Sequence, residues 1–178
     1  MTPLAGRVAL VTGAGHRVGR AIALAMGEDG AHVAVHYHGS EEPARATAAA
    51  IERGGGSAST FRADLRDADA AAALAAAVRA ACGRLDVLVN SAASMMRTPL
   101  DTVTPAQWDE LFAINARAPF FLSQAAAAHL ANANGAIVNI ADIHAERPLR
   151  EHAVYAMSKA ALLHMTRSLA LEVAPKVR

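Results

Sequence analysis

A tyrosine and a lysine stand four positions apart in the segment YAMSK at residues 155–159. Side chains at this spacing project from one face of a helix, so the two groups can act as a unit. A nearby ammonium group stabilises a phenolate and lowers the pKa of a tyrosine from about 10 toward the working range. We therefore expect Tyr155, assisted by Lys159, to donate a proton to a reacting carbonyl or imine. Taken alone, the pair is also typical of a solvated helix face.

A glycine-rich string, TGAGHRVG at residues 12–19, lies where a short apolar run ends and a helical pattern begins. Gly13 and Gly15 let the backbone approach a pyrophosphate closely, and Gly19 lets the helix pack against the sheet. The helix N-terminus adds unpaired N–H groups and the positive end of its dipole. The position of the string predicts a dinucleotide site, and an ordinary strand-to-helix turn is the alternative. The cofactor-binding residues expected in this string are Gly13, Arg17, Val18 and Gly19.

The end of the second expected strand bears on which nicotinamide dinucleotide is bound, because a carboxylate there normally accepts from the ribose 2'-hydroxyl of NAD. Here the sequence reads HYHGS at residues 36–40, with no acid before Glu41. Donors at these positions would suit a 2'-phosphate, which favours NADPH. A metal held by the two histidines is the competing interpretation, but no second ligand cluster has suitable spacing, so no metal is expected. The expected 2'-phosphate donors are Arg17, Tyr37, His38 and Ser40.

Short apolar runs alternate with longer alanine-rich segments along the chain, which is typical of βαβ units and a parallel sheet. Strands are expected at Val8–Val11, His32–Tyr37, Ser57–Ala63, Leu85–Val89 and Ala136–Ile140. Helices are expected at about Val18–Gly27, Glu41–Arg53, Asp67–Ala81, Pro105–Leu130 and His152–Val173. Pro119 should kink or restart the fourth helix. The predicted fold class is α/β, a Rossmann-type doubly wound parallel sheet, with residues 1–178 forming one domain.

Charge and composition exclude several classes of function. The chain has 17 basic and 16 acidic side chains, and its net charge of +1 provides no large field for nucleic acid or an anionic membrane. No apolar run approaches the roughly 18–20 residues of a membrane span, and the N-terminus carries no signal core. Cys82 is the single cysteine, so no internal disulfide can form. We expect a cytoplasmic protein without nucleic-acid or membrane partners.

Together these pieces resemble the short-chain dehydrogenase/reductase family over essentially the whole chain. The resemblance rests on residues 12–19, Asp64, the string NSAA at residues 90–93, Asn115, and Tyr155 with Lys159. It implies that Lys159 holds the nicotinamide ribose, and that Asn115 holds a water chain that relays protons to Lys159. Without it, Asn115 would be interpreted as a polar break in a helix near Pro119. The further cofactor contacts that it implies are Asp64 and Leu65 at the adenine, and Asn90, Ser91 and Ala92.

Three departures from the family pattern narrow the likeness: Arg17 at the usual middle glycine, the HYH string at residues 36–38, and Asp142 in place of a serine that donates to the substrate carbonyl. Together they resemble pteridine reductases and the related bacterial dihydromonapterin reductases, in which Asp, Tyr and Lys form the catalytic set. An ionised carboxylate cannot donate to a ketone oxygen, but it can accept from Tyr155 or from a ring N–H group. This favours reduction of a C=N bond in a nitrogen heterocycle. Asp142 could instead cap its loop or pair with an arginine at residue 147 or 150.

The substrate positions fit that likeness less well. Where pteridine reductases resemble one another in a serine and an aromatic that sandwiches the pterin, this chain has Ala93 and Met95. Met95 can cover a ring face more loosely through its polarisable sulfur, or it can be ordinary loop packing. The expected substrate contacts are Ala93, Met95, Asp142 and Tyr155.

Three functions follow from these residues. The first is NADPH-dependent reduction of a pterin, dihydropterin or folate C=N bond by Tyr155, Lys159, Asp142 and Asn115. The second is NADPH-dependent reduction of a 3-oxoacyl thioester or small ketone. The third is an inactive nucleotide-binding fragment or partner-binding domain.

The third function has weight because family members resembling this chain continue with a sixth strand and a loop that covers the substrate. Val177 matches the first residue of that strand, so we expect a fold truncated after the fifth strand and the helix that follows it. We also expect a homo-oligomer, a dimer or tetramer, formed through the last helix and the helix from Pro105.

Overall fold

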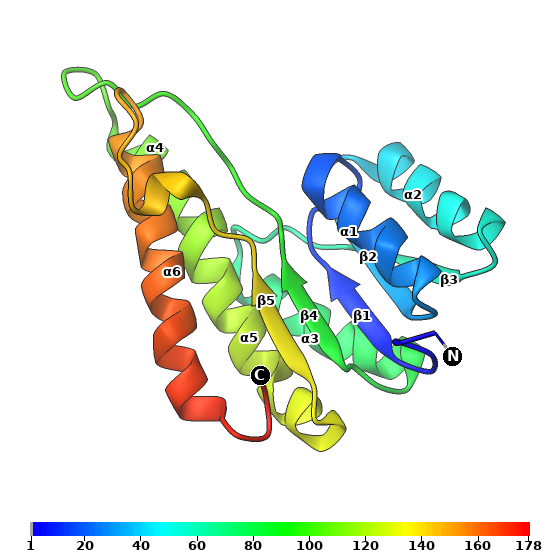
Figure 1. Cartoon of the computed structure of the whole chain (residues 1–178). Coiled ribbons are helices and arrows are strands. Elements are labelled where there is room, and N and C mark those ends of the chain that lie inside the picture. The colour runs from blue at the N-terminus through cyan, green and yellow to red at the C-terminus, as the bar shows by residue number, and fades with distance from the viewer. Residues whose placement is uncertain (1) are drawn as a thin grey trace.

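A five-stranded parallel sheet forms the centre of the computed structural model, which describes residues 2–178 (Figure 1). The strands pair in the order β3-β2-β1-β4-β5, and every neighbouring pair is parallel. This confirms the predicted doubly wound α/β fold. The strands are β1 (Val8–Val11), β2 (His32–Tyr37), β3 (Ser57–Arg62), β4 (Val87–Asn90) and β5 (Ala136–Asn139).

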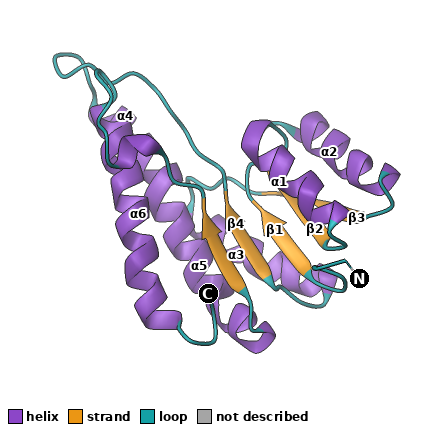
Figure 2. Cartoon of the chain, viewed as in Figure 1, coloured by secondary structure: helices purple, strands orange, loops and turns teal. Residues whose placement is uncertain are grey.

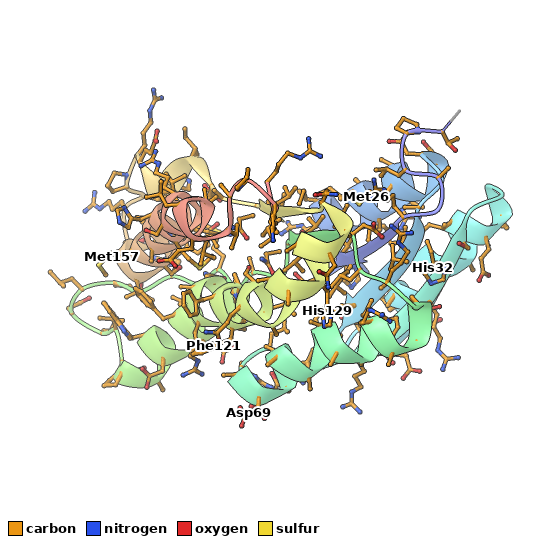
Figure 3. All side chains as sticks on the ribbon, turned by 90° about the horizontal axis from the view of Figure 1, so that it is seen from below. Met26, His32, Asp69, Phe121, His129 and Met157 are labelled. Atoms are coloured by element: carbon orange, nitrogen blue, oxygen red, sulfur yellow. The ribbon has the colours of Figure 1, made fainter. Side chains whose placement is uncertain are left out.

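Helices cover both faces of this sheet (Figure 2). The first two helices pack on one face, and the later ones pack on the other, so that Met26 of α1 and Asp69 of α3 lie on opposite sides of the sheet (Figure 3). No helix within residues 2–178 is both long enough and apolar enough to span a bilayer. The helical elements are α1 (Arg17–Glu28), α2 (Glu41–Arg53), α3 (Ala68–Cys82), α4 (Pro105–Phe112), the π-helical turn η1 (Ala113–Arg117), α5 (Ala118–Ala133), the 3-10 turn η2 (Ile143–Ala145) and α6 (Ala153–Val173).

Strand β1 separates two apolar cores because its successive side chains point to opposite faces. Val8 and Leu10 enter the core beneath α3 and α5, whereas Ala9 and Val11 enter the core beneath α1 and α2. All four are buried, as expected for a continuous apolar strand covered by helices on both faces. Helices therefore pack against both faces of the sheet, and only loops cover its carboxyl edge.

The long helix expected from Pro105 to Leu130 is interrupted by the π-helical turn η1. The α-helix restarts at Ala118, directly before Pro119, as the sequence predicts. Pro119 lies in the first turn of α5, where proline is tolerated. The π-helical turn places Asn115 in the interior, and its side chain is bound on all sides by polar partners.

The last described residues run beside β5. The N–H of Ile137 donates to the carbonyl of Arg178 at 2.8 Å, and the N–H of Arg178 donates to the carbonyl of Gly135 at 3.1 Å. Val177 is buried against the core beneath α3 and α5. This is the place that the expected sixth strand would take, and the expectation of a truncated sheet stays a prediction.

Candidate active site

A cavity of about 680 Å³ lies at the carboxyl edge of the sheet. Its walls come from the segments that follow all five strands and from the first turns of α6. Doubly wound sheets bind ligands at this edge, at the point where the strand order reverses. The residues that line the cavity are Gly13, His16, Arg17, Val18, Gly19, His36, His38, Asp64, Leu65, Arg66, Ser91, Ala92, Ala93, Ser94, Met95, Glu110, Ile114, Ile140, Ala141, Asp142, Tyr155 and Lys159.

The three titratable groups predicted to do the chemistry meet in this cavity. The hydroxyl of Tyr155 donates to Oδ2 of Asp142 at 2.6 Å. Nζ of Lys159, one turn further along α6, donates to the carbonyl oxygen of Ile140 at 2.9 Å. Tyr155 and Lys159 are each only 4% exposed, so both side chains are held by the protein and not by solvent. The arrangement presents one hydroxyl, one ammonium and one carboxylate to the same space.

The protonation of Tyr155 differs from the sequence-based expectation. Burial raises the pKa of Tyr155 well above its usual range, and the hydrogen bond to Asp142 and the charge of this carboxylate raise it further. Burial lowers the pKa of Lys159, and the charge of Asp142 partly opposes this. The expected lowering of the tyrosine pKa by Lys159 is therefore wrong for this state, because burial and the hydrogen bond to the Asp142 carboxylate both disfavour the phenolate. Tyr155 is a protonated donor at neutral pH.

Asp142 both caps a turn and contacts Tyr155. Its Oδ1 accepts from the N–H of His144 at 2.9 Å, and this bond caps the start of η2. Its Oδ2 accepts from the hydroxyl of Tyr155. Burial raises the pKa of this carboxyl, but these hydrogen bonds and the charges of His144 and Lys159 outweigh burial and leave the pKa below its usual value. No ion pair of Asp142 with an arginine forms within residues 2–178. Asp142 is an anionic acceptor in the cavity wall.

The glycine-rich string forms the turn from β1 into α1 and lines the same cavity. A Cβ atom on Gly19 would lie 2.5 Å from the carbonyl oxygen of Gly13, so this contact between helix and turn requires glycine. Arg17 adopts a φ of 47°, a left-handed conformation that glycine accommodates more easily. His16 precedes the helix without making a capping hydrogen bond from its side chain. The first-turn N–H groups of α1 are thus left uncapped by this side chain and can meet an anion.

A second group of polar residues lies around the end of β3. Arg66 donates to both carboxylate oxygens of Asp64, and Nε2 of His38 lies 3.6 Å from Oδ2 of the same carboxylate. The hydrogen bond from Arg66 lowers the pKa of Asp64 to about 2. Asp64 is therefore an anion, and with Leu65 it forms the wall at which the adenine is expected.

Two residues expected at the 2'-phosphate lie outside the cavity lining. Tyr37 packs with Val33 and Val35 in the core beneath α1 and α2, because alternate strand residues share a face. His36 and His38 occupy the alternate positions and line the cavity. Ser40 is the residue that precedes α2 and is absent from the lining.

Two asparagines expected at the cofactor or in catalysis also lie behind the cavity wall. Nδ2 of Asn90 donates to Oδ1 of Asn139 at 2.8 Å and to Oγ of Ser123 at 3.3 Å, which joins the ends of β4 and β5. Asn115 binds the backbone of Ser94 twice: its Oδ1 accepts from the N–H and its Nδ2 donates to the carbonyl, each at 2.8 Å. In this state both side chains support the walls of the site.

Sequence reasoning missed part of the lining. Ile140 and Ala141 follow β5, and Arg66 follows β3, so the tendency of ligands to bind at the carboxyl ends of parallel strands could have found them. Glu110 and Ile114 come from α4 and η1, and no local sequence signal places them in the cavity. For His36 the sequence offers only a metal pair with His38 as an alternative, and no metal is expected there. Its ring bonds to the backbone instead.

Comparison with known proteins assigns the family. The sequence pattern of the family described as short chain dehydrogenase matches residues 7–178, and the chain belongs to this family. It is 37% identical to the hydroxynaphthalene reductase-like protein Arp2 of Metarhizium guizhouense, over 97% of this chain and 65% of that protein. It is 36% identical to versicolorin reductase 1 of Aspergillus parasiticus, over 97% of this chain and 66% of that protein. The chain thus spans about 65% of the length of such relatives.

Solved structures agree with this assignment. A metagenomic short-chain oxidoreductase in complex with NADP superposes with a TM-score of 0.94 at 40% identity, covering 99% of this chain and 80% of that chain. The landomycin C-6 ketoreductase with bound NADP and rabelomycin superposes with a TM-score of 0.91 at 35% identity, covering 98% of this chain and 74% of that chain. None of these four relatives is named a pteridine reductase, so the expected likeness to that subfamily gains no support from them.

Proposed function

We propose that this chain carries the cofactor site and catalytic residues of an NADPH-dependent reductase of aromatic polycyclic ketones. The observation that carries the proposal is the protonated hydroxyl of Tyr155 in the cavity wall, one helical turn from Lys159. Support for the substrate class comes from the relatives named as a hydroxynaphthalene reductase-like protein, a versicolorin reductase and a landomycin C-6 ketoreductase. This corresponds to the second of the three functions expected from the sequence, with a larger substrate.

The residues around the cavity fit NADPH. The uncapped first turn of α1 provides N–H groups and a positive dipole end for a pyrophosphate. Arg17 and His38 line the cavity and can donate to a 2'-phosphate, while Asp64 and Leu65 form the wall for the adenine. Lys159 is the cavity residue suited to hold the nicotinamide ribose. When bound, the cofactor supplies the hydride to the substrate carbon.

Tyr155 and Lys159 provide the other half of the reaction. The ketone oxygen gains a proton from the Tyr155 hydroxyl as its carbon gains the hydride, so the C=O bond becomes an alcohol. A ketone oxygen must replace Oδ2 of Asp142 as the acceptor of the Tyr155 hydrogen bond before this transfer. The ammonium group of Lys159 then stabilises the phenolate that the transfer leaves behind.

Reduction of a C=N bond in a pterin-like heterocycle is the second candidate function, and Asp142 is the observation that favours it. Its anionic carboxylate lines the cavity and already accepts from Tyr155, but it has no proton to donate to a ketone oxygen. A heterocycle with ring and exocyclic N–H groups would satisfy both carboxylate oxygens.

Turnover on two substrates separates the candidates. We expect NADPH oxidation with a hydroxynaphthalene-type ketone, and loss of turnover by a factor of about 100 or more in Tyr155→Phe with NADPH binding retained. Oxidation only with a dihydropterin would replace the proposal with the second candidate. NADPH binding without turnover on either substrate would contradict both and favour the inactive binding domain.

We further propose that the protein self-associates as a dimer or tetramer through α4, α5 and α6. Trp108, Phe120 and Met157 are large apolar side chains on these helices, and each is more than one third exposed. Light scattering tests this directly, and a monodisperse 18.4 kDa species would contradict it.

A further inference from the structure

His36 is buried near the end of β2, and it is bound to the phosphate loop by both its ring and its backbone. Its Nδ1 accepts from the N–H of Gly13 at 3.2 Å, and its carbonyl oxygen accepts from the N–H of Ala14 at 3.1 Å. On its other side, Nε2 lies 3.2 Å from the carbonyl oxygen of Ala63. Only 2% of the residue is exposed, although its ring reaches the cavity lining.

These contacts determine the protonation state of the ring. An atom that accepts a hydrogen bond from a backbone N–H carries no proton, so Nδ1 is bare and Nε2–H donates to the carbonyl of Ala63. Burial lowers the pKa of His36 to about 4, with the nearby His38 acting in the same direction and the carbonyl of Ala63 acting against it. The ring is therefore neutral at pH 7 and serves as a fixed pair of one acceptor and one donor.

The ring joins two parts of the cavity that are distant in sequence. Gly13 lies in the turn that leads into α1, and it adopts a φ of 65°. Ala63 directly precedes Asp64 and Leu65, which form the adenine wall. Because two successive loop N–H groups are already bound to His36, they are not available to a ligand. An anion in this cavity would have to be held by the N–H groups further along, in the first turn of α1.

We propose that His36 is a positioning residue for the cofactor: its ring fixes Gly13 relative to the adenine wall, so that the first turn of α1 faces the pyrophosphate. This inference rests on the proposed binding of NADPH. His36 does not contact the reacting atoms in this arrangement, so its effect falls on cofactor affinity and not on the chemical step. The bond that matters is the one to Gly13, and the bond to Ala63 orients the ring.

Two amide substitutions separate these two bonds. In His36→Asn the side-chain oxygen replaces Nδ1 as the acceptor for Gly13, whereas in His36→Gln the longer amide replaces Nε2–H as the donor to Ala63. His36→Leu keeps neither. The matched control is His32→Asn on the same strand and the same face, whose ring contacts Ser57 and Ser59.

The measurements are NADPH affinity by calorimetry, the KM for NADPH and kcat, and amide hydrogen exchange of Gly13 in the cofactor-free protein. We expect wild type, His36→Asn and His32→Asn to bind NADPH alike, and His36→Gln and His36→Leu to bind about tenfold more weakly at unchanged kcat. Exchange at Gly13 should be faster in the two weak binders only.

Equal NADPH affinity across the His36 variants would overturn the inference, and so would rescue by His36→Gln but not by His36→Asn. If His36→Leu does not fold, the comparison of the two amide variants still decides. If the wild type itself binds no NADPH, the proposed function fails. The exchange rates at Gly13 then test the positioning role alone, and equal rates in all variants would contradict it.

Discussion

Tyr155 donates to a carboxylate that would oppose the proton transfer we propose for ketone reduction. A tyrosine that gives up its proton becomes an anion, and Asp142 at 2.6 Å makes that anion costly. Burial and this carboxylate together hold the pKa of Tyr155 far above its usual value of about 10. The negative charge of Asp142 keeps the Tyr155 hydroxyl protonated, but the same charge makes Tyr155 a weaker acid.

We predict that Asp142→Ser speeds ketone reduction and slows reduction of a dihydropterin, because serine can donate to a ketone oxygen and the carboxylate cannot. Removing the carboxylate lowers the pKa of Tyr155, so the basic limb of the kcat/KM profile should move to lower pH. Steady-state rates over a pH series measure both effects. Asp142→Asn is the control of equal size without charge, and a basic limb at the same pH in all three proteins would contradict the assignment.

Arg17 combines a cation with an unfavourable backbone conformation. A left-handed φ costs a residue other than glycine about 1–2 kcal/mol, while glycine loses about 0.5–1 kcal/mol through chain entropy. We predict that Arg17→Gly leaves the free energy of unfolding unchanged or raises it by about 1 kcal/mol, and that it weakens NADPH binding at least tenfold. Urea unfolding and calorimetry measure the two quantities.

The affinity for NADH distinguishes a charge effect from a damaged loop. Arg17→Gly should leave NADH affinity unchanged, because the lost guanidinium is expected at the 2'-phosphate that NADH lacks. Arg17→Lys keeps a cation with the same backbone strain and should retain most of the preference for NADPH. Equal losses for both cofactors in Arg17→Gly would show that the backbone, and not the charge, determines binding.

At the scale of elements, η1 links α6 to the loop after β4. Asn115 reaches this position only because the π-helical turn places it in the interior, where it binds both backbone groups of Ser94 and Oγ of Ser158 on α6. π-helical turns interrupt α-helices frequently at functional sites. One side chain therefore joins η1, α6 and a wall of the cavity.

We predict that Asn115→Ala lowers the free energy of unfolding by roughly 2–4 kcal/mol, because the backbone of Ser94 and the buried hydroxyl of Ser158 lose their partner. Ser158→Ala removes one of these bonds and should cost about 1 kcal/mol. Denaturant unfolding of the two variants tests the order of the effects. A smaller loss for Asn115→Ala than for Ser158→Ala would show that the contacts to Ser94 contribute little.

The elements that could be predicted from sequence are those with a local cause. The buried strand at Val8–Val11 has a continuous apolar pattern, and apart from the interruption at η1 the strands and helices lie within a few residues of the predicted bounds. The π-helical turn itself could not be predicted, because the partners that Asn115 meets there, Ser94 and Ser158, are distant in the sequence. A proline gives a visible local signal, and the predicted restart of the helix at Pro119 is confirmed.

The candidate site shows the same division. Residues at the carboxyl ends of strands, such as Asp64 and Ser91, could be placed at the cavity from topology alone. Successive residues of β2 point to opposite faces of the sheet, so His36 and Tyr37 cannot both face the cavity. Which of them does so depends on how β2 lies in the sheet. The hydrogen bond between Asp142 and Tyr155, which determines the pKa of the tyrosine, depends on how the loop after β5 folds against α6.

For the whole molecule, the two ends of the parallel strands have different roles. The cavity lies at the carboxyl edge of the sheet, whereas Asp86, which is 1% exposed, links the segments at the opposite, amino edge. Its carboxylate accepts from Arg7 at 2.8 Å, from Arg84 at 2.6 Å and from the N–H of Val8 at 2.9 Å. These groups come from the segments that lead into β1 and β4. Stability and binding should therefore respond separately to changes at the two edges.

Asp86 provides the test of this separation. Burial raises its pKa, but the bonds from Arg84, Val8 and Arg7 outweigh burial and hold the pKa below its usual value. A carboxyl with a depressed folded-state pKa contributes stability that is fully present above the unfolded pKa of about 3.9 and is lost as pH falls through the folded pKa.

We predict that Asp86→Asn lowers the free energy of unfolding at pH 7 by roughly 1–3 kcal/mol and flattens its decline below about pH 4. Denaturant unfolding across a pH series measures this, and NADPH affinity should stay unchanged because the site lies at the other edge. A loss of NADPH affinity comparable with that of Arg17→Gly would contradict the separation and show that the sheet transmits the change from one edge to the other.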